Sequence, residues 1–222
     1  MNFSPDLIIE ATAVCNRSCH GCYAPNVVSI ESATDLFNKK KDLFLDPNDL
    51  DKILRENPSR AKVISIRGGE PSLHPRLAEI LRVATIHSEK VIIETHGRWL
   101  LPETMEEYSK LIREIQSLGS TVKISFDKMH GLSKDELHQI TQLLDWNFIP
   151  FLIAITENNE QEFEVARKQC SWIPSEEIIF QKKAFSQNGL IQPRMGVVSV
   201  EGKLNNGLSI KDSLLEKVAV TA

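Results

Sequence analysis

Strand-like and helix-like segments alternate along most of this chain of 222 residues. Short apolar, β-branched runs typical of buried strands are followed by amphipathic stretches with helical spacing. The predicted strands are residues 7–11, 62–66, 91–94, 121–126, 148–155 and 177–180, and the predicted helices are residues 47–56, 75–87, 102–117, a segment starting at Ser133, and 159–168. This alternation predicts an α/β fold with a parallel sheet. Six units are too few for a closed eight-stranded barrel, so we expect a partial (βα)6 TIM-like barrel, open on one side.

Local signals place two of the helix starts. Asp46 is a candidate N-cap with Pro47 at the first helical position. Ser133, with Glu136 three residues later, has the spacing of a capping box. Residues 26–41 carry the weakest pattern, and we interpret them, with the Lys39–Lys41 run, as a solvated surface segment.

The alternation ends near Ala184. Residues 187–193 are predicted to form a loop, 195–200 a strand and 210–218 a short helix, with a turn at Glu201-Gly202. We therefore expect a core domain over residues 1–184 and a short C-terminal extension over residues 185–222.

The net charge of −4 gives no support for nucleic-acid binding through bulk electrostatics. No apolar run approaches the ~20 residues that a membrane span needs. The first residues lack the basic stretch and apolar core of a signal peptide. We expect a cytoplasmic protein without a membrane partner.

Three of the four cysteines, Cys15, Cys19 and Cys22, stand together directly after the first predicted strand. This clustering is a metal-binding pattern rather than a disulfide framework. Three thiolates on a 4Fe–4S cluster would leave one iron without a protein ligand, and an open position usually marks chemistry. Zinc, with His20 as a further ligand, is the alternative, although zinc sites more often use C-x2-C pairs. Cys170 is predicted to be a free buried thiol.

Unusual residues also follow the other predicted strands, where parallel β/α folds carry their reactive groups. These segments are Arg67-Gly68-Gly69-Glu70-Pro71, Thr95-His96-Gly97, Ser125-Phe126-Asp127, Thr156-Glu157-Asn158 and Gln181-Lys182-Lys183. Each alone is a weak signal: Gly68-Gly69-Glu70 has the composition of an ordinary turn, and Ser125 and Asp127 are equally suited to capping one. His96 and His130 are interpreted as polar loop residues. The shared position of these segments predicts one active-site mouth.

Two motifs resemble those of the radical S-adenosylmethionine (radical SAM) superfamily. They are Glu10-x-Thr12-x-x-Cys15-Asn16-x-x-Cys19-x-x-Cys22-Tyr23 and Gly68-Gly69-Glu70-Pro71. The β/α pattern extends the resemblance over residues 7–184. It implies one 4Fe–4S cluster held by the three cysteines, with S-adenosylmethionine on the open iron.

The resemblance also implies roles for the residues at the strand ends. Tyr23 would shield the cluster or help hold the adenine. Gly68 and Gly69 would let the backbone approach the methionyl group, and Glu70 would bind its ammonium. Thr95 is a second candidate for the methionyl end, although His96 stands where the family often has Asn. Ser125 and Asp127 are predicted to bind the ribose hydroxyls or the carboxylate.

No cysteine follows Cys170, so the extension has no ligands for an auxiliary cluster, and we expect it to close the barrel or cover the substrate. A single-cluster enzyme would need an outside reductant such as flavodoxin or ferredoxin. The leading hypothesis is a radical SAM enzyme that abstracts hydrogen from a small molecule or peptide, in an epimerisation, dehydrogenation, deamination or ring formation. The alternatives are an activase that installs a glycyl radical on a partner protein, and a non-catalytic zinc-binding module.

Overall fold

The computed structural model describes residues 5–19, 22, 33–57, 61–182 and 196–205, and its contacts divide the chain into two compact units. Ser4–Ile93 and Leu190–Ala222 form one unit, which holds Cys15, Cys19 and Cys22 and is called the cysteine unit. Met1–Phe3 and Glu94–Gly189 form the other, which holds all three tryptophans and is called the tryptophan unit.

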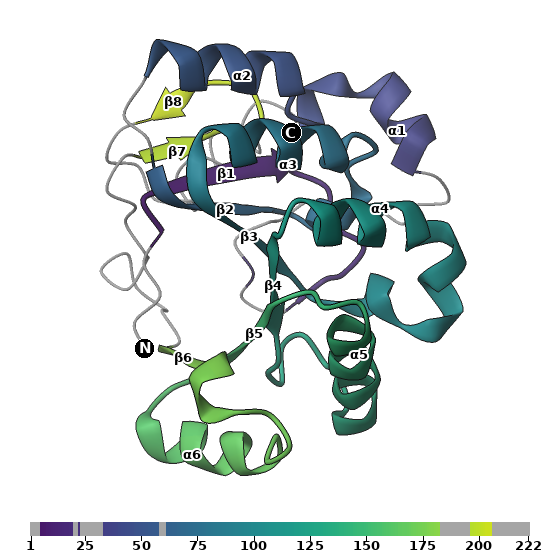
Figure 1. Ribbon diagram of the computed structural model, residues 1–222, viewed down its shortest axis with the longest axis vertical. Helices are drawn as coiled ribbons and strands as arrows, with labels where there is room; N and C mark the ends of the chain where they lie inside the picture. Colours follow the sequence, from purple (N-terminus) through teal and green to yellow (C-terminus); the bar gives the residue numbers. More distant parts are fainter. Residues whose placement is uncertain (1–4, 20–21, 23–32, 58–60, 183–195, 206–222) are drawn as a thin grey trace. The chain divides into compact units, whose positions relative to one another are not determined.

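Parallel strands make the sheet of the cysteine unit (Figure 1). Strand β1 (Leu7–Thr12) pairs in parallel with β2 (Ala61–Gly68), and β2 pairs in parallel with β3 (Ser88–Thr95), whose last two residues belong to the tryptophan unit. All six residues of β1 are buried, as expected for a parallel strand covered on both faces. The three predicted strands of this region are confirmed, each longer than the sequence indicates.

The C-terminal extension adds two strands to this sheet. Strand β7 (Gly196–Val198) pairs in parallel with β1 on the side away from β2, and β8 (Leu204–Asn205) runs antiparallel to β7. The turn between them includes Gly202, whose φ is 69°. The predicted strand at 195–200 is confirmed in shortened form, whereas the predicted loop at 187–193 and helix at 210–218 lie outside the described residues.

Among its described residues, the cysteine unit has three α-helices: α1 (Ala33–Lys39), α2 (Pro47–Glu56) and α3 (Leu77–Ile86). Helix α2 begins as predicted, because the carboxylate of Asp46 accepts a hydrogen bond from the Asn48 N–H at 2.8 Å. Lys39, Lys40 and Lys41 are exposed as expected. Helix α1 itself corrects the prediction of a solvated segment, because Leu36 and Phe37 pack against the buried core of the unit.

That core lies directly beneath the end of β1. Its buried members come from four separate parts of the unit, including the extension, and they are Ile8, Ala13, Val14, Leu43, Phe44, Leu73 and Val200. Burial of this apolar surface therefore fixes the chain that leads into the cysteines.

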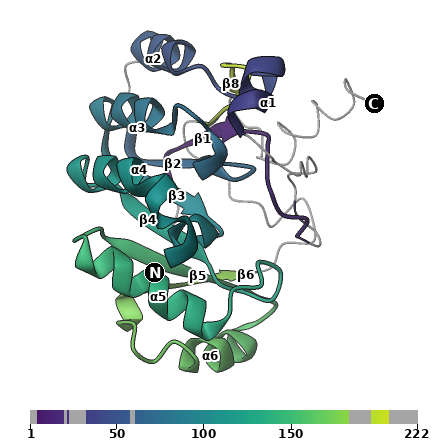
Figure 2. The ribbon, with the colours of Figure 1, turned by 90° about the vertical axis from the view of Figure 1, so that its right-hand side faces the viewer.

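The tryptophan unit has the same β/α order. Strands β4 (Thr121–Ser125), β5 (Phe151–Glu157) and β6 (Ile178–Lys182) pair in parallel. Helix α4 (Met105–Ser117) precedes β4, α5 (Lys134–Trp146) follows it, and α6 (Glu160–Lys168) lies against β5 and β6 (Figure 2). The capping box of Ser133 and Glu136 is present at the start of α5, as predicted.

Two predicted starts in this unit are wrong by three residues. Strand β5 begins at Phe151 rather than Phe148, because Phe148 lies in the turn after α5 with a φ of 53° and is 87 % exposed. Helix α4 begins at Met105, because Pro102–Thr104 forms a separate 3₁₀ turn. None of the described helices is long and apolar enough to cross a membrane.

Candidate functional site

A short antiparallel bridge holds the chain just before the cysteines. The N–H of Ala13 donates to the carbonyl of Leu43, and the N–H of Leu45 donates to the carbonyl of Ala11, both at 2.9 Å. The Thr12 hydroxyl donates to the same Leu43 carbonyl at 3.0 Å and accepts from the N–H of Val14 at 3.1 Å. The threonine of the first motif therefore anchors the strand end.

The three cysteines form no disulfide in the described structure, and they differ in exposure. Cys15 is buried, Cys19 is partly exposed and Cys22 is exposed. The Cys22 N–H donates to the Cys19 carbonyl at 3.1 Å, which makes a tight turn between the second and third cysteines. Among the described residues, no three His, Cys, Asp or Glu side chains are gathered in metal-binding geometry.

The second motif is docked on the first through the backbone. The Gly69 N–H donates to the Thr12 carbonyl at 2.6 Å, and the Glu70 N–H donates to the Val14 carbonyl at 2.8 Å. A Cβ atom at Gly69 would collide with the Val14 carbonyl, and one at Gly68, where φ is 133°, would collide with the Thr12 carbonyl. Both glycines are therefore required by close backbone approach.

Glu70 is also held by the turn that follows it. Its side chain is buried, and Oε1 accepts a hydrogen bond from the Ser72 N–H at 3.1 Å. Glu70 follows directly on Gly69, so it belongs to the segment whose backbone hydrogen bonds hold the chain before Cys15. The structure therefore brings together Cys15, Gly68, Gly69 and Glu70, as the sequence predicts.

Burial dominates the electrostatics of the first cysteine. It raises the pKa of the Cys15 thiol to about 12; a hydrogen bond from the Arg17 backbone opposes this shift, and the nearby Glu70, Cys22 and Cys19 add to it. A metal ion bound by Cys15 would have to displace this proton. Three soft sulfur donors lie on one short loop, and beside them are two glycines that leave no room for a Cβ. These residues fit an iron–sulfur cluster and a bound methionyl group.

At the end of β3 in the tryptophan unit, the expected site residue Thr95 and its neighbour His96 are engaged in local structure. The Thr95 hydroxyl accepts hydrogen bonds from the Gly97 N–H at 3.0 Å and from Nε1–H of Trp99 at 2.9 Å. Nδ1 of His96 accepts from the Arg98 N–H at 3.1 Å. These contacts shape the turn after β3 and hold Trp99 beside the strand.

Asp127 caps the turn after β4. Its Oδ1 accepts from the backbone N–H groups of Met129 and His130 at 2.9 and 3.0 Å, and from Nδ1–H of His130 at 2.8 Å. Burial alone would raise the pKa of Asp127, but the contacts with His130 and Met129 lower it overall. Within the described structure, the buried Oδ2 has no hydrogen-bond partner, so an acceptor remains for a ligand that donates.

The remaining expected residues are placed as follows. Ser125 is the last residue of β4 and is partly buried, so Asp127 lies two residues beyond the strand rather than on it. Tyr23 lies outside the described residues. Cys170 is a free buried thiol, as predicted, and burial raises its pKa to about 11.

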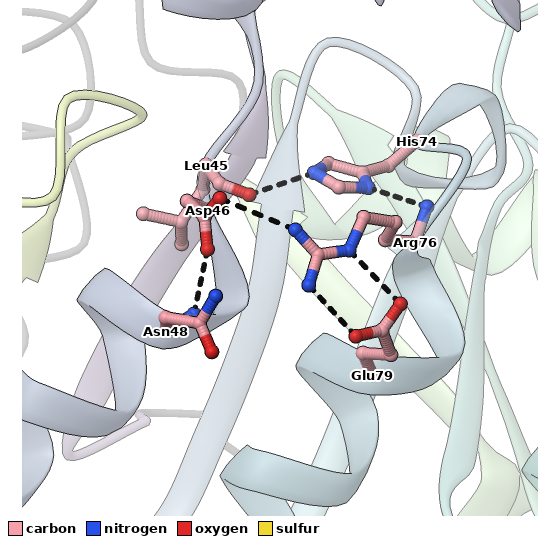
Figure 3. Close-up of polar contacts among 6 residues, drawn as sticks. All are labelled: Leu45, Asp46, Asn48, His74, Arg76 and Glu79. Carbon is pink, nitrogen blue, oxygen red and sulfur yellow. Dashed lines mark hydrogen bonds and ion pairs between the residues drawn. The ribbon is translucent and has the colours of Figure 1, made fainter.

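A polar network in the cysteine unit was not expected from the sequence (Figure 3). Nδ1 of His74 accepts from the Arg76 N–H at 3.0 Å, so Nε2 carries the proton and donates to the Leu45 carbonyl at 2.9 Å. Arg76 in turn binds Glu79 at 2.8 Å and Asp46 at 3.2 Å. The network fixes the segment that pairs with the end of β1.

Comparison with known proteins agrees with this arrangement. The family model described as the radical SAM superfamily matches residues 9–144, which is more than half of the chain. The chain belongs to this superfamily and is therefore an enzyme. Membership implies a 4Fe–4S cluster and S-adenosylmethionine.

Individual relatives are longer than this chain. The AdoMet-dependent heme synthase of Methanosarcina barkeri (strain Fusaro / DSM 804) is 29% identical over 181 residues, which are 76% of this chain and 49% of that protein. The structure of anSMEcpe with bound AdoMet is 15% identical with a TM-score of 0.53, covering 82% of this chain and 54% of that one. SuiB of Streptococcus suis bound to S-adenosylmethionine is 15% identical with a TM-score of 0.45, covering 82% and 51%.

The chain thus spans about half the length of the relatives it matches. The likeness to anSMEcpe shows the fold alone, and with the parallel strands of each unit it confirms the predicted α/β partial barrel that is not closed.

Proposed function

We propose that this chain holds one 4Fe–4S cluster through Cys15, Cys19 and Cys22 and uses it with S-adenosylmethionine to start a radical reaction on a substrate. The observation that carries the proposal is the backbone docking of Gly69 and Glu70 on the residues that lead to Cys15. This docking links the cluster loop to the loop proposed to hold the methionyl group.

The chain's own residues have distinct tasks in this proposal. Gly68 and Gly69 have no side chains, so the methionyl group can approach their backbone. The Glu70 carboxylate binds the ammonium of that group by a charge-assisted hydrogen bond. Ser125 and Asp127 bind hydroxyl groups, because the free Oδ2 of an ionised carboxylate accepts hydrogen bonds and repels a second carboxylate. Tyr23 and Thr95 are the other two residues proposed to bind S-adenosylmethionine.

The chemistry that the reduced cluster and S-adenosylmethionine supply when bound is a 5′-deoxyadenosyl radical, which removes a hydrogen atom from the substrate. A reductant protein such as flavodoxin or ferredoxin is proposed to deliver the electron. Residues 1–184 are proposed to form the core and residues 185–222 an extension without an auxiliary cluster.

The proposed substrate is a small molecule or a short peptide. The heme synthase relative, at 29% identity over three quarters of the chain, supports the small-molecule choice. The solved structures, at 15% identity, carry no argument about substrate.

Metal analysis and product analysis test the proposal. Anaerobically reconstituted protein is expected to bind about four irons per chain and, with dithionite, to convert S-adenosylmethionine to 5′-deoxyadenosine. Cys19→Ala is expected to lose both properties, because one of three cluster ligands is removed. Cys170→Ala is the matched control and is expected to keep both, because this thiol lies outside the cysteine loop.

Zinc in place of iron in the reconstituted protein would overturn the proposal in favour of a zinc-binding module. So would 5′-deoxyadenosine formation by the Cys19→Ala protein at the wild-type rate. Formation of a glycyl radical on a co-purified partner would instead identify the chain as an activase.

A further inference from the structure

A buried ion pair in the tryptophan unit joins Glu94, near the end of β3, to Lys123 in the middle of β4. Nζ of Lys123 lies 3.0 Å from Oε2 of Glu94. The Lys123 side chain is 1 % exposed and is among the largest fully buried side chains of the protein. Neither residue belongs to one of the two sequence motifs.

The pair lies on the face of the strands opposite to the helices. Ile124 of β4 faces α5, because a Cβ on Gly97 would lie 3.2 Å from Ile124 and 3.4 Å from Ile140 of that helix. Side chains alternate along a strand, so Lys123 and Ser125 point to the other face. Ser125 is one of the residues proposed to contact S-adenosylmethionine.

The same alternation orients Glu94 on β3. Its neighbour Thr95 binds Trp99, whose ring packs on Tyr108 of α4 at a centroid distance of 5.5 Å. Thr95 therefore faces α4, and Glu94 faces the side of Lys123 and Ser125. Across from Ser125 on that face, β5 carries the small residue Ala154.

The two members of the pair are unequally exposed. Glu94 keeps 16 % of its side-chain surface accessible, whereas Lys123 is enclosed. Burying an ammonium group is costly, and an apolar pair of similar volume often gives equal or greater stability. The arrangement is better explained by a requirement for a fixed carboxylate at this position than by a contribution to folding.

We propose that Glu94 is a cofactor-binding residue that accepts a hydrogen bond from an N–H or O–H group of S-adenosylmethionine, and that Lys123 is the positioning residue that fixes its carboxylate. The proposal rests on the proposed function, since it requires that the chain binds S-adenosylmethionine. Within the tryptophan unit, it adds Glu94 of β3 to the contact proposed for Ser125 of β4.

The test compares binding and stability in two variants of the reconstituted enzyme. Glu94→Gln removes the charge and keeps the shape, while Glu94→Leu/Lys123→Met replaces the pair by apolar side chains. Equilibrium dialysis with S-adenosylhomocysteine is expected to show at least a tenfold weaker affinity in both, because hydrogen bonds to charged groups are among the stronger ones. The urea midpoint of the double variant is expected to equal or exceed that of the wild type.

The matched control is Glu164→Leu/Arg167→Met, which removes an ion pair of 2.8 Å on the exposed side of α6. It is expected to leave affinity unchanged. Wild-type affinity in both Glu94 variants would overturn the inference and leave the proposed function intact. Failure of the wild-type holoenzyme to bind the probe would instead overturn the proposed function, and this inference with it. Loss of affinity together with a lowered urea midpoint in the double variant would assign the pair a structural role.

Discussion

Gly69 has no room for a side chain, because its Cα faces the carbonyl of Val14 one residue before Cys15. The contact couples two loops that are far apart in the sequence. A change at this glycine therefore acts on the cysteine loop without touching a sulfur atom.

Gly69→Ala is expected to destabilise the protein by about 1–3 kcal/mol, as overpacking against a rigid backbone does, and to lower its iron content after reconstitution. Urea unfolding and iron analysis measure the two effects. The control is Gly119→Ala, where φ is 62° but no atom lies within 4 Å of the added Cβ. It is expected to cost about 1–2 kcal/mol through backbone strain and to keep full iron content. Equal iron content in both variants would show that the contact does not support the cluster loop.

The residues of the two motifs were predictable because their chemistry is local. Three cysteines within eight residues need no tertiary information to indicate a metal site, and two adjacent glycines before a glutamate mark a close approach. The partners of Asp127 and Lys123 were not predictable in this way. His130 is an ordinary loop histidine until the turn brings it to Asp127, and Glu94 lies 29 positions from Lys123.

At the level of elements, His74 ties the start of α3 to the segment before α2. Burial lowers the pKa of His74 from 6.5 to about 4, outweighing the hydrogen bond to the Leu45 carbonyl. Its ring also packs edge-on against Phe44, at a centroid distance of 5.6 Å. The neutral ring is thus part of the support for the end of β1.

This buried histidine makes stability depend on pH. The pKa of His74 is near 6.5 in the unfolded chain and about 4 in the folded chain. The contribution of His74 to the free energy of unfolding is therefore fully present above pH 6.5, and it is lost as the pH falls toward 4. Between pH 7.5 and pH 5 the loss is expected to be about 2 kcal/mol. Urea unfolding at both pH values measures it. His74→Gln, which keeps a donor for Leu45, is expected to remove most of this difference; an unchanged difference would assign it to other groups.

Helix starts with a capping residue were predictable because the signal lies within four residues, as at Asp46 and Ser133. Helix α1 was missed because its stability comes from burying Leu36 and Phe37 on residues distant in the sequence. The predicted start of β5 was wrong because Phe148 and Ile149 are residue types that favour strands. The turn after α5 instead places Phe148 in the left-handed region. Tertiary contacts decided both cases.

At the scale of the whole molecule, all three tryptophans lie in one unit and the three neighbouring cysteines lie in the other. Trp99 is 3 % exposed and Trp146 is 85 % exposed, so unfolding changes the environment of Trp99 far more. Strand β3 contributes residues to both units. The chain therefore passes from one unit to the other inside a regular strand.

Tryptophan fluorescence and far-UV circular dichroism are therefore expected to give the same urea midpoint, as in a cooperative two-state transition. Trp146→Phe removes the exposed fluorophore and is expected to sharpen the signal without moving the midpoint. An earlier fluorescence transition would show that the tryptophan unit unfolds independently.

The parallel pairing of β7 with β1 also sets an order of events during synthesis. Ile9 lies beside Val198, so the strand that leads into the cysteines gains its second neighbour only after residues 94–189 of the tryptophan unit have been made. Val200, in the turn after β7, completes the buried core beneath that strand. Because a ribosome adds about 5–20 residues per second, the β7 side of β1 stays unpaired for many seconds. Any delay in the pairing of β7 therefore leaves the strand before Cys15 open to aggregation along one edge.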